Sequence, residues 1–445
     1  MTFVTYIKWN NSIICCKIGS MKILFVLECA NMPTNGTTAS CIRFAKELEK
    51  KGHEVTIIGC DRIIGEKYHR YFGLPKYRFP VTDPLILKGG FLVCRCMIET
   101  IREAIKGQDL VHCFLPFKLS NVCRLIAQEQ GIAVTTAFHI VPQNVTAAMH
   151  LAWSRLINGI LLFSFKNYLY NQIKYVHCPS PMAADIMKRH NFKNNEPRVF
   201  SNGVIPFFKK MESNRPKEYE GKFIVCMSGR LVDEKRQDLL IKAVAKSKYN
   251  NQIQVILCGQ GTNYKYYQKL GKKLANPLVI KFCKQEEVRE ILNYIDLYVH
   301  ASDYEIEGIA AIEAITCGRV ALISDSKYCA TKDFAVNKEL CLFKHGSSKD
   351  LCKKIEWFYE HPQELKQLEE QYLESSKQYA LSKQVDALEQ MFMDAIKDQK
   401  EGKDLHTIHP RKKDERLLKR TYRAYEKQKK HPERYLGDNK SVISQ

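Results

Sequence analysis

Short apolar runs alternate with amphipathic segments along most of the chain. An apolar run over residues 22–27 is followed, over 37–51, by apolar side chains at the three- and four-residue spacing of a helix. A second apolar run comes at 54–59, directly after a Gly-His turn. Further runs predict strands at 109–113, 133–138 and 174–178. Strands that alternate with helices form a parallel, doubly wound sheet, so the pattern predicts an α/β fold.

The alternation begins again near residue 222, which predicts a second domain of the same class. Its strands are predicted at 223–228, 254–258, 279–283, 297–300 and 320–323. The polar stretch 205–220 between the two blocks contains a proline and is interpreted as a linker. Near the end of the second block, residues 381–397 have the apolar periodicity of an amphipathic helix.

We expect the fold to begin at Met21, with residues 1–20 forming an extension of little structure. These first residues contain several polar side chains and lack the apolar core of a signal peptide. The predicted segments are this extension (1–20), an N-terminal Rossmann-like domain (21–205), a C-terminal domain (206–380), a helix (381–398) and a tail (399–445).

The amino-acid composition indicates the cellular compartment and the kind of partner that the protein binds. The chain has 445 residues, of which 45% are hydrophobic, enough to form two cores. Its 17 cysteines are scattered without a C-x-x-C pair, which favours a reducing cytoplasm. No stretch approaches the roughly 20 apolar residues of a membrane span. The net charge of +21 indicates an anionic partner: an acidic lipid surface, nucleic acid or an anionic substrate.

Much of that charge lies in the tail, 399–445, where basic clusters alternate with tyrosines. Two interpretations stay open: a solvated helix, or an anchor that binds anionic headgroups at the inner face of the cell membrane. If the tail is an anchor, we expect its removal to leave the domains folded. Nothing in the chain resembles a base-reading module, so no nucleic-acid partner is expected.

Two motifs carry candidate chemistry. In E-I-E-G-I-A-A-I-E, at 305–313, Glu305 and Glu313 stand eight positions apart at a predicted helix start. Upstream, S-G-R-L-V-D-E-K-R at 228–236 places Arg230 and Lys235 in a strand-to-helix turn, where backbone N–H groups also favour an anion. Either motif alone is common on ordinary helices. Together, cations for a diphosphate and acids for hydroxyl groups indicate a nucleotide-sugar site.

The two motifs in this order resemble those of the family-4 retaining glycosyltransferases of GT-B fold, including bacterial lipid and cell-envelope enzymes, over roughly residues 21–396. The resemblance implies two Rossmann-like parallel-sheet domains that face a cleft, the N-terminal one on the acceptor side and the C-terminal one binding the nucleotide sugar, with 381–398 crossing back. It assigns Arg230 and Lys235 to the donor diphosphate, Glu305 to the donor sugar and Glu313 to the ribose.

The same resemblance suggests further site residues. His139 matches a catalytic histidine that reaches the sugar–phosphate junction, and Glu305 is the second catalytic candidate. Where the family has a Gly-Gly pair near the phosphate, this chain has Asn35-Gly36. The remaining donor-binding positions are Gly36, Gly229, Gly259, Phe282, Gly308 and Ile309.

The predicted activity is transfer of a hexose from a nucleotide-diphosphate sugar to a glycolipid or lipid-linked saccharide, with retained configuration. No D-x-D motif follows a strand, so we expect neither a metal nor a cofactor. The apolar segment 151–174 is interpreted as a buried core helix or as an interfacial helix that favours a lipid acceptor. Two alternatives stay open: a nucleotide-sugar epimerase or phosphorylase, and a non-catalytic relative that binds membranes.

Overall fold

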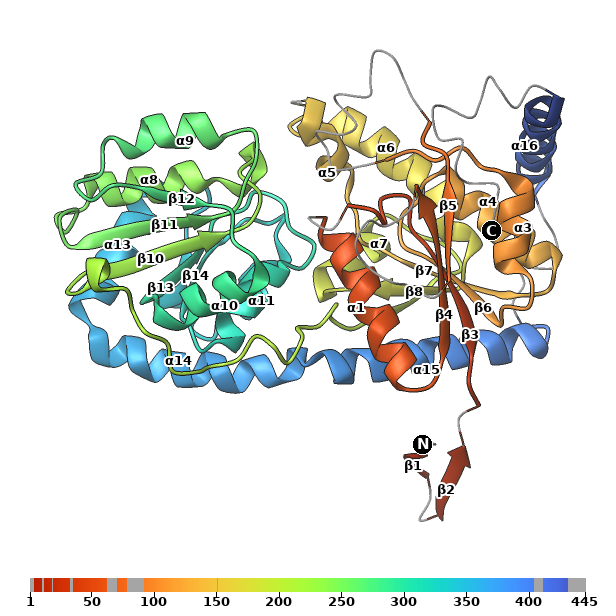
Figure 1. Ribbon diagram of the computed structural model, residues 1–445, viewed down its shortest axis with the longest axis horizontal. Coiled ribbons are helices and arrows are strands. Elements are labelled where there is room, and N and C mark those ends of the chain that lie inside the picture. The colour runs from red at the N-terminus through yellow and green to blue at the C-terminus, as the bar shows by residue number, and fades with distance from the viewer. Residues whose placement is uncertain are drawn as a thin grey trace. The chain divides into compact units, whose positions relative to one another are not determined.

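The structure is a computed structural model that describes residues 4–9, 12–17, 19–32, 35–61, 70–77, 92–149, 151–403 and 411–430. The chain forms two units (Figure 1). The first comprises Met1–Cys178, Ile186–Phe200 and Val385–Gln445, and the second comprises Pro179–Asp185 and Ser201–Gln384. The domain boundaries drawn from the sequence stay predictions.

The first unit is built on a seven-stranded parallel sheet of order β5-β4-β3-β6-β7-β8-β9. Its strands are β3 (Lys22–Val26), β4 (Glu54–Cys60), β5 (Tyr71–Leu74), β6 (Leu110–Cys113), β7 (Ala133–Ala137), β8 (Tyr175–Cys178) and β9 (Glu196–Val199). All five strands predicted here are confirmed. The two that the pattern missed, β5 and β9, are the edges of the sheet, where a strand is short and β9 even contains a proline.

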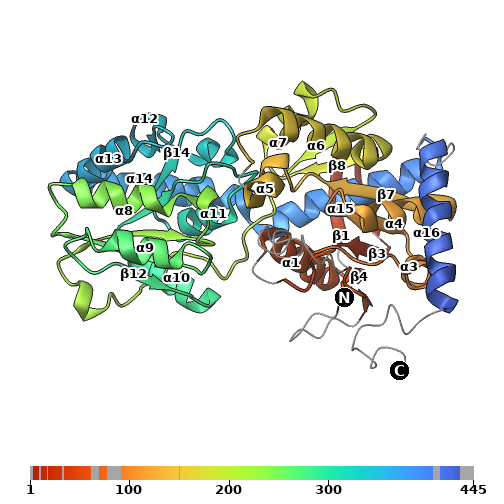
Figure 2. The ribbon, with the colours of Figure 1, turned by 90° about the horizontal axis from the view of Figure 1, so that it is seen from above.

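Helices cover both faces of this sheet (Figures 1 and 2). Leu24 and Val26 lie in one apolar cluster with α3 (Ile98–Ile105) and α4 (Lys118–Glu129). Phe25 points the other way and contacts Phe392 of α15 (Leu381–Lys400), at 6.3 Å between ring centroids. This alternation is the period of two expected of a strand buried on both sides. The longer helices are α1 (Gly36–Lys50), α3 (Ile98–Ile105), α4 (Lys118–Glu129), α6 (Arg155–Tyr168), α7 (Pro181–Arg189), α15 (Leu381–Lys400) and α16 (Lys412–Lys430).

The second unit has a six-stranded parallel sheet of order β12-β11-β10-β13-β14-β15. Its strands are β10 (Phe223–Ser228), β11 (Ile253–Cys258), β12 (Val279–Lys281), β13 (Leu297–His300), β14 (Ala321–Ser324) and β15 (Leu342–Phe343). The five predicted strands are confirmed. Its helices are α8 (Gln237–Lys246), α9 (Tyr264–Gly271), α10 (Gln285–Tyr294), α11 (Ile309–Thr316), α12 (Lys338–Cys341), α13 (Ser348–Glu360) and α14 (Pro362–Ser376).

The N-terminal extension differs from the expectation of little structure. Strands β1 (Val4–Trp9) and β2 (Ser12–Lys17) pair as an antiparallel hairpin. Both strands contain β-branched residues, which favour extended backbone. Elsewhere, no helix among the described residues is long and apolar enough to cross a membrane.

The tail also differs, because its described part belongs to the first unit. Leu418, Tyr422 and Tyr425 of α16 pack into the apolar cluster of α3 and α4. Tyr425 donates a hydrogen bond to Glu99, and the Asp414 carboxylate lies 3.2 Å from the Arg124 guanidinium. Tyr422 and Tyr425, two tyrosines of the predicted headgroup anchor, therefore hold the helix to the protein. Removing the tail would expose part of an apolar cluster and a buried arginine, and the expectation that the domains fold without it stays a prediction.

The first prediction concerns this buried ion pair. Asp414 and Arg124 are 5% and 2% exposed, so Asp414→Ala leaves a buried cation without its partner. We expect the free energy of unfolding to fall by about 3 kcal/mol, because a broken buried pair costs more than an exposed one gains. Denaturant unfolding measures the loss. The adjacent exposed Glu415→Ala is the control and should change stability by less than about 0.5 kcal/mol. Equal stability of both variants and the wild type would contradict the pair's role.

Candidate functional site

The two predicted motifs meet at the point where the strand order of the second sheet reverses. β10 and β13 are parallel neighbours, and the chain leaves β10 at Gly229 and β13 at Ala301. The carboxyl ends of neighbouring parallel strands lie at one edge of a sheet, which is where α/β folds bind ligands. The turn at 229–236 and the loop at 301–308 therefore share one edge. The segment 301–308 is called the acid loop below.

Lys235 and Glu305 form the central contact of this edge. Lys235 ends a short 3₁₀ turn (Asp233–Lys235), and its ammonium donates a hydrogen bond to the Glu305 carboxylate. Both side chains are about one-fifth exposed. Burial by itself would raise the pKa of the Glu305 carboxyl, but the Lys235 and His300 side chains outweigh it and hold that pKa well below the usual range. Glu305 is therefore a carboxylate at neutral pH.

His300 is a site residue that the motifs did not reveal. It is the last residue of β13, and its Nε2 lies 3.5 Å from a Glu305 oxygen, at the outer limit of hydrogen bonding. Burial lowers the pKa of the imidazole, and Glu305 opposes that effect without reversing it. Its place at the carboxyl end of a predicted central strand was the available signal.

The second cation is more open. Arg230 is 41% exposed, and its Nη2 lies 3.1 Å from Glu234 on the same turn. The Lys235 ammonium carries three N–H donors, so its bond to Glu305 leaves donors for a second anion. The arrangement can thus present two cations to a diphosphate while one of them also holds a carboxylate.

Glycines let these loops approach one another. Gly308 has φ 92°, and a Cβ at this position would lie 2.2 Å from Thr331 and 3.3 Å from Glu305. A Cβ on Gly259 would lie 1.9 Å from the Gly229 carbonyl oxygen, so the G-x-G turn after β11 packs directly on the turn after β10. Within the unit Gly259 meets backbone only, and its predicted contact with the donor stays a prediction.

The remaining predicted positions of this unit surround the same edge. Ile309 is the first residue of α11, and Glu313 lies one turn further along, half-buried. Phe282 follows β12 and is 57% exposed. Glu307 lies between the two motif acids and has a structural role. It is buried, and it accepts hydrogen bonds from Ser201 and Asn202, which connect the acid loop to residues 201–202 of the same unit.

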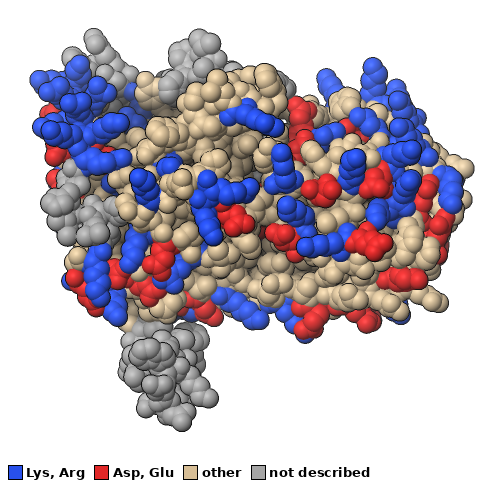
Figure 3. All heavy atoms as spheres, turned by 180° about the vertical axis from the view of Figure 1, so that it is seen from behind, with Lys and Arg blue, Asp and Glu red and all other residues tan. Residues whose placement is uncertain are grey.

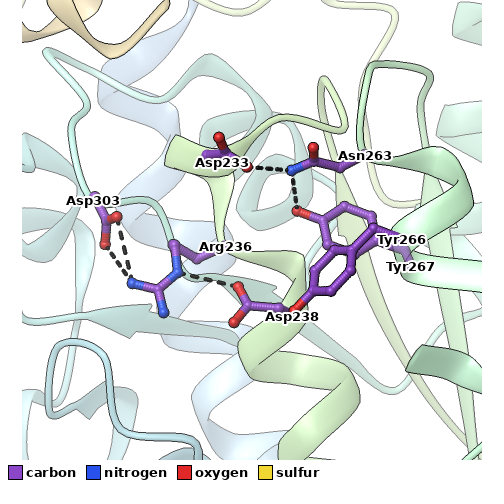
Figure 4. A pocket seen from close by; sticks show the side chains of 7 residues that line it. All are labelled: Asp233, Arg236, Asp238, Asn263, Tyr266, Tyr267 and Asp303. Carbon is purple, nitrogen blue, oxygen red and sulfur yellow. Dashed lines mark hydrogen bonds and ion pairs between the residues drawn. The ribbon is translucent and has the colours of Figure 1, made fainter. Parts of the chain in front are cut away.

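A polar pocket of about 460 Å³ opens beside the 229–236 turn (Figure 4). Three aspartates, two tyrosines, an asparagine and Arg236 line it. Arg236 has φ 55° and ψ 38°, a left-handed conformation that costs a non-glycine residue about 1–2 kcal/mol. Neither Arg236 nor its partner Asp303 was among the predicted site residues. The sequence shows neither the left-handed backbone of Arg236 nor its contact with Asp303.

The two predicted residues of the first unit lie at the carboxyl edge of its own sheet. His139 comes shortly after β7, stacks on Phe114 and meets His177 edge to face, and its Nε2 is buried without a hydrogen-bond partner in the described part of the chain. Burial first, then the neighbouring histidines, lower the pKa of His139 well below its usual range, so the ring is neutral. Gly36 begins α1, directly after Asn35, whose side chain accepts a hydrogen bond from the Thr37 N–H and caps the helix. Thr34, next to them in the predicted loop, lies outside the described residues.

The described side chains contain no group of three or more His, Cys, Asp or Glu that could hold a metal ion. The charge of this edge comes instead from the paired cations and carboxylates described above.

Comparison with known proteins gives relatives of one kind. The catalytic domain of a cholesterol-α-glucosyltransferase from Helicobacter pylori is 40% identical, covering 36% of this chain and 99% of that domain, with a TM-score of 0.34. A GDP-mannose-dependent α-mannosyltransferase from Mycolicibacterium smegmatis is 23% identical over 320 residues, covering 69% of this chain and 80% of that protein. HepE from Anabaena, solved in complex with UDP and glucose, is 16% identical with a TM-score of 0.66, covering 84% of this chain and all of that one.

Two family models match consecutive parts of the chain. The model described as glycosyltransferase family 4 matches residues 34–206, and the model described as glycosyl transferases group 1 matches residues 208–375. The parallel sheets of both units agree with the GT-B fold of the solved neighbours. The chain therefore belongs to the group 1 and family 4 glycosyltransferases, GT-B enzymes that transfer a sugar residue from a nucleotide-sugar donor.

Proposed function

We propose that this enzyme transfers a hexose, with retained anomeric configuration, from a nucleotide-diphosphate sugar to a lipid or lipid-linked saccharide. It would act as a peripheral protein on the inner, anionic face of the cell membrane. The observation that carries the acceptor class is an exposed apolar stripe on and just before α6.

Four large apolar side chains form this stripe. Trp153, Leu156, Ile160 and Phe163 are 77%, 74%, 62% and 67% exposed, and their spacing of three, four and three residues puts them on one side. The opposite side of α6 packs inward through Leu162 and Phe165. Apolar patches of this kind on a protein surface mark binding sites. An amphipathic helix with such an outer face suits the boundary between lipid headgroups and acyl chains.

The outer face of α16 adds positive charge to the same unit. Seven of its exposed cations gather on the side opposite the docked tyrosines, and Figure 3 shows the resulting blue cluster on the back of the molecule. They are Lys412, Arg416, Lys419, Arg420, Arg423, Lys427 and Lys430. Each cation near an anionic bilayer adds about 1 kcal/mol to binding, so this face supports attachment to acidic lipid.

The proposed chemistry follows from charge. Cleaving the bond between the anomeric carbon and the diphosphate leaves negative charge on the phosphate, which Arg230 and Lys235 stabilise. Glu305 contacts the donor sugar, Glu313 the ribose, and neutral His139 offers a hydrogen bond without adding charge. The acceptor hydroxyl attacks on the face from which the diphosphate departs, so the new glycosidic bond keeps the configuration, and the hydroxyl proton leaves with the phosphate.

Arg230→Ala and Lys235→Ala should each lower the transfer rate about a hundredfold, because one preorganised cation contributes about 3 kcal/mol to stabilising the developing charge. Release of nucleotide diphosphate from a panel of nucleotide sugars measures the rate. Lys248→Ala removes an exposed lysine whose partner is Glu360, outside the site, and is the matched control. If either site variant kept activity within threefold of wild type, the replaced residue would not stabilise the diphosphate as proposed.

Transfer should continue in the presence of EDTA. The two cations already supply the positive charge that a divalent ion provides elsewhere, and the sequence has no D-x-D motif at a strand end. The measurement compares initial rates before and after chelation, with magnesium or manganese added back. A complete loss that either ion restores would show that the enzyme uses a metal.

The two surfaces of the first unit make separable contributions to membrane binding. Replacing Arg416, Arg420 and Arg423 by glutamate should remove the salt-sensitive part of binding to vesicles that contain phosphatidylglycerol. Wild-type binding should also weaken with salt, since the Debye length shrinks from about 10 Å at 0.1 M to about 3 Å at 1 M. Replacing Leu156, Ile160 and Phe163 by serine should remove the part of binding that resists salt, at about 1.5–3 kcal/mol for each side chain that inserts fully.

Co-sedimentation with vesicles measures all of these variants. The control replaces Lys349, Lys353 and Lys366 by glutamate, an equal change of charge at exposed positions of the second unit. This control should bind as the wild type does. If both α6 and α16 variants also bind as the wild type does, the membrane proposal fails.

A further inference from the structure

Arg236 adopts a backbone conformation that its own residue type does not favour. The described residues include four non-glycine residues with positive φ: Asp61, Asn191, Asn194 and Arg236. Aspartate and asparagine tolerate this region because their short side chains form local hydrogen bonds, but arginine has no such help. The conformation persists because surrounding contacts hold it.

Those contacts join the first turn of α8 to the acid loop. The Arg236 guanidinium lies 3.2 and 3.4 Å from the two carboxylate oxygens of Asp303, and its Nε lies 3.1 Å from Asp238 (Figure 4). All three side chains are largely buried, with exposed fractions of 27%, 20% and 10%. A single nitrogen, Nη1, makes both contacts with Asp303, and Nε faces Asp238, so the guanidinium is held between two carboxylates.

Asp303 is held from other sides as well. Its backbone N–H donates to the Glu234 carbonyl at 2.8 Å, and its carboxylate lies 2.7 Å from His345 Nε2. Its carbonyl accepts a hydrogen bond from Ser326 at 2.9 Å. The acid loop contains no helix and only an isolated bridge at Glu305, so such contacts set its position.

Two adjacent cations therefore hold two acids of one loop. Lys235 pairs with Glu305, and Arg236 pairs with Asp303, two residues earlier. One turn of the chain, 235–236, therefore engages two carboxylates of the acid loop.

We propose that Arg236 is a positioning residue for the transfer reaction. By holding Asp303, it fixes the acid loop so that Glu305 meets the donor sugar in the reactive geometry. The proposal rests on the proposed function, in which Glu305 contacts that sugar. Arg236 itself touches no substrate, so its loss should lower kcat and leave nucleotide binding unchanged.

The test is Arg236→Gly, which removes the side chain and suits the left-handed backbone. We expect kcat to fall about ten- to a hundredfold, since a displacement of about 1 Å can cost about a hundredfold in rate. The dissociation constants of UDP and GDP, used as probes, should match those of the wild type, and the melting temperature should stay close to it. Arg236→Lys, which restores one charge, should recover part of kcat.

Further variants distinguish the loss of the Arg236–Asp303 contact from general damage to the structure. Asp303→Asn should reproduce the loss, and the double variant should be no slower than either single one, because both remove the same contact. Asn194→Gly makes the matched backbone change at an exposed residue in the turn between α7 and β9 and should keep full activity.

Three outcomes would overturn the proposal: kcat of Arg236→Gly within twofold of wild type, additive losses in the double variant, or an equal loss of UDP or GDP affinity. The last would mean that Arg236 contacts the donor directly. A wild-type enzyme that releases no nucleotide diphosphate from any nucleotide sugar would count against the proposed function instead.

Discussion

Parallel pairing of β10 with β13 is the constraint on which the candidate donor site depends. The two strands are matched at Val225 with Leu297 and at Cys226 with Tyr298, so both end at the same edge of the sheet. Lys235 and Glu305, 70 residues apart in sequence, can meet because of that register. The register in turn is set by strands whose apolar side chains are buried on both faces, since a slip of one residue would exchange the faces.

At this edge of the sheet, neighbouring charges determine whether Glu305 is ionised. Burial favours the neutral form of Glu305, but the nearby Lys235 ammonium restores the carboxylate. Lys235 therefore has two tasks: it keeps an acid ionised, and it presents its other donors to an anion. Removing it takes away the largest contribution that lowers the pKa of Glu305 and also changes the field at the diphosphate, whereas removing Arg230, which is more exposed, changes the field alone.

In the first unit, the helices α16 and α6 each have one buried face and one exposed face of different composition. α16 places Asp414 and its tyrosines inward, where they satisfy Arg124 and Glu99, and leaves its cations outward. α6 buries two apolar residues, Leu162 and Phe165, and exposes a stripe of others. The net charge of +21 by itself indicates only an anionic partner. The exposed cations along one face of the docked α16 are what favours a membrane surface in the proposal.

Sequence alone determined the central strands and the order of the two motifs. The predicted strands 223–228 and 297–300 coincide with β10 and β13, because a strand buried on both faces requires an unbroken apolar run. The edge strands β5, β9 and β15 escaped prediction, since an edge is covered less and carries a weaker pattern. The tertiary structure decided the docking of α16, the place of His300 beside Glu305, and the left-handed Arg236 with its grip on Asp303. Each of these depends on a contact between residues far apart in the chain, and a local pattern of apolar and polar positions does not encode which distant partner a side chain will meet.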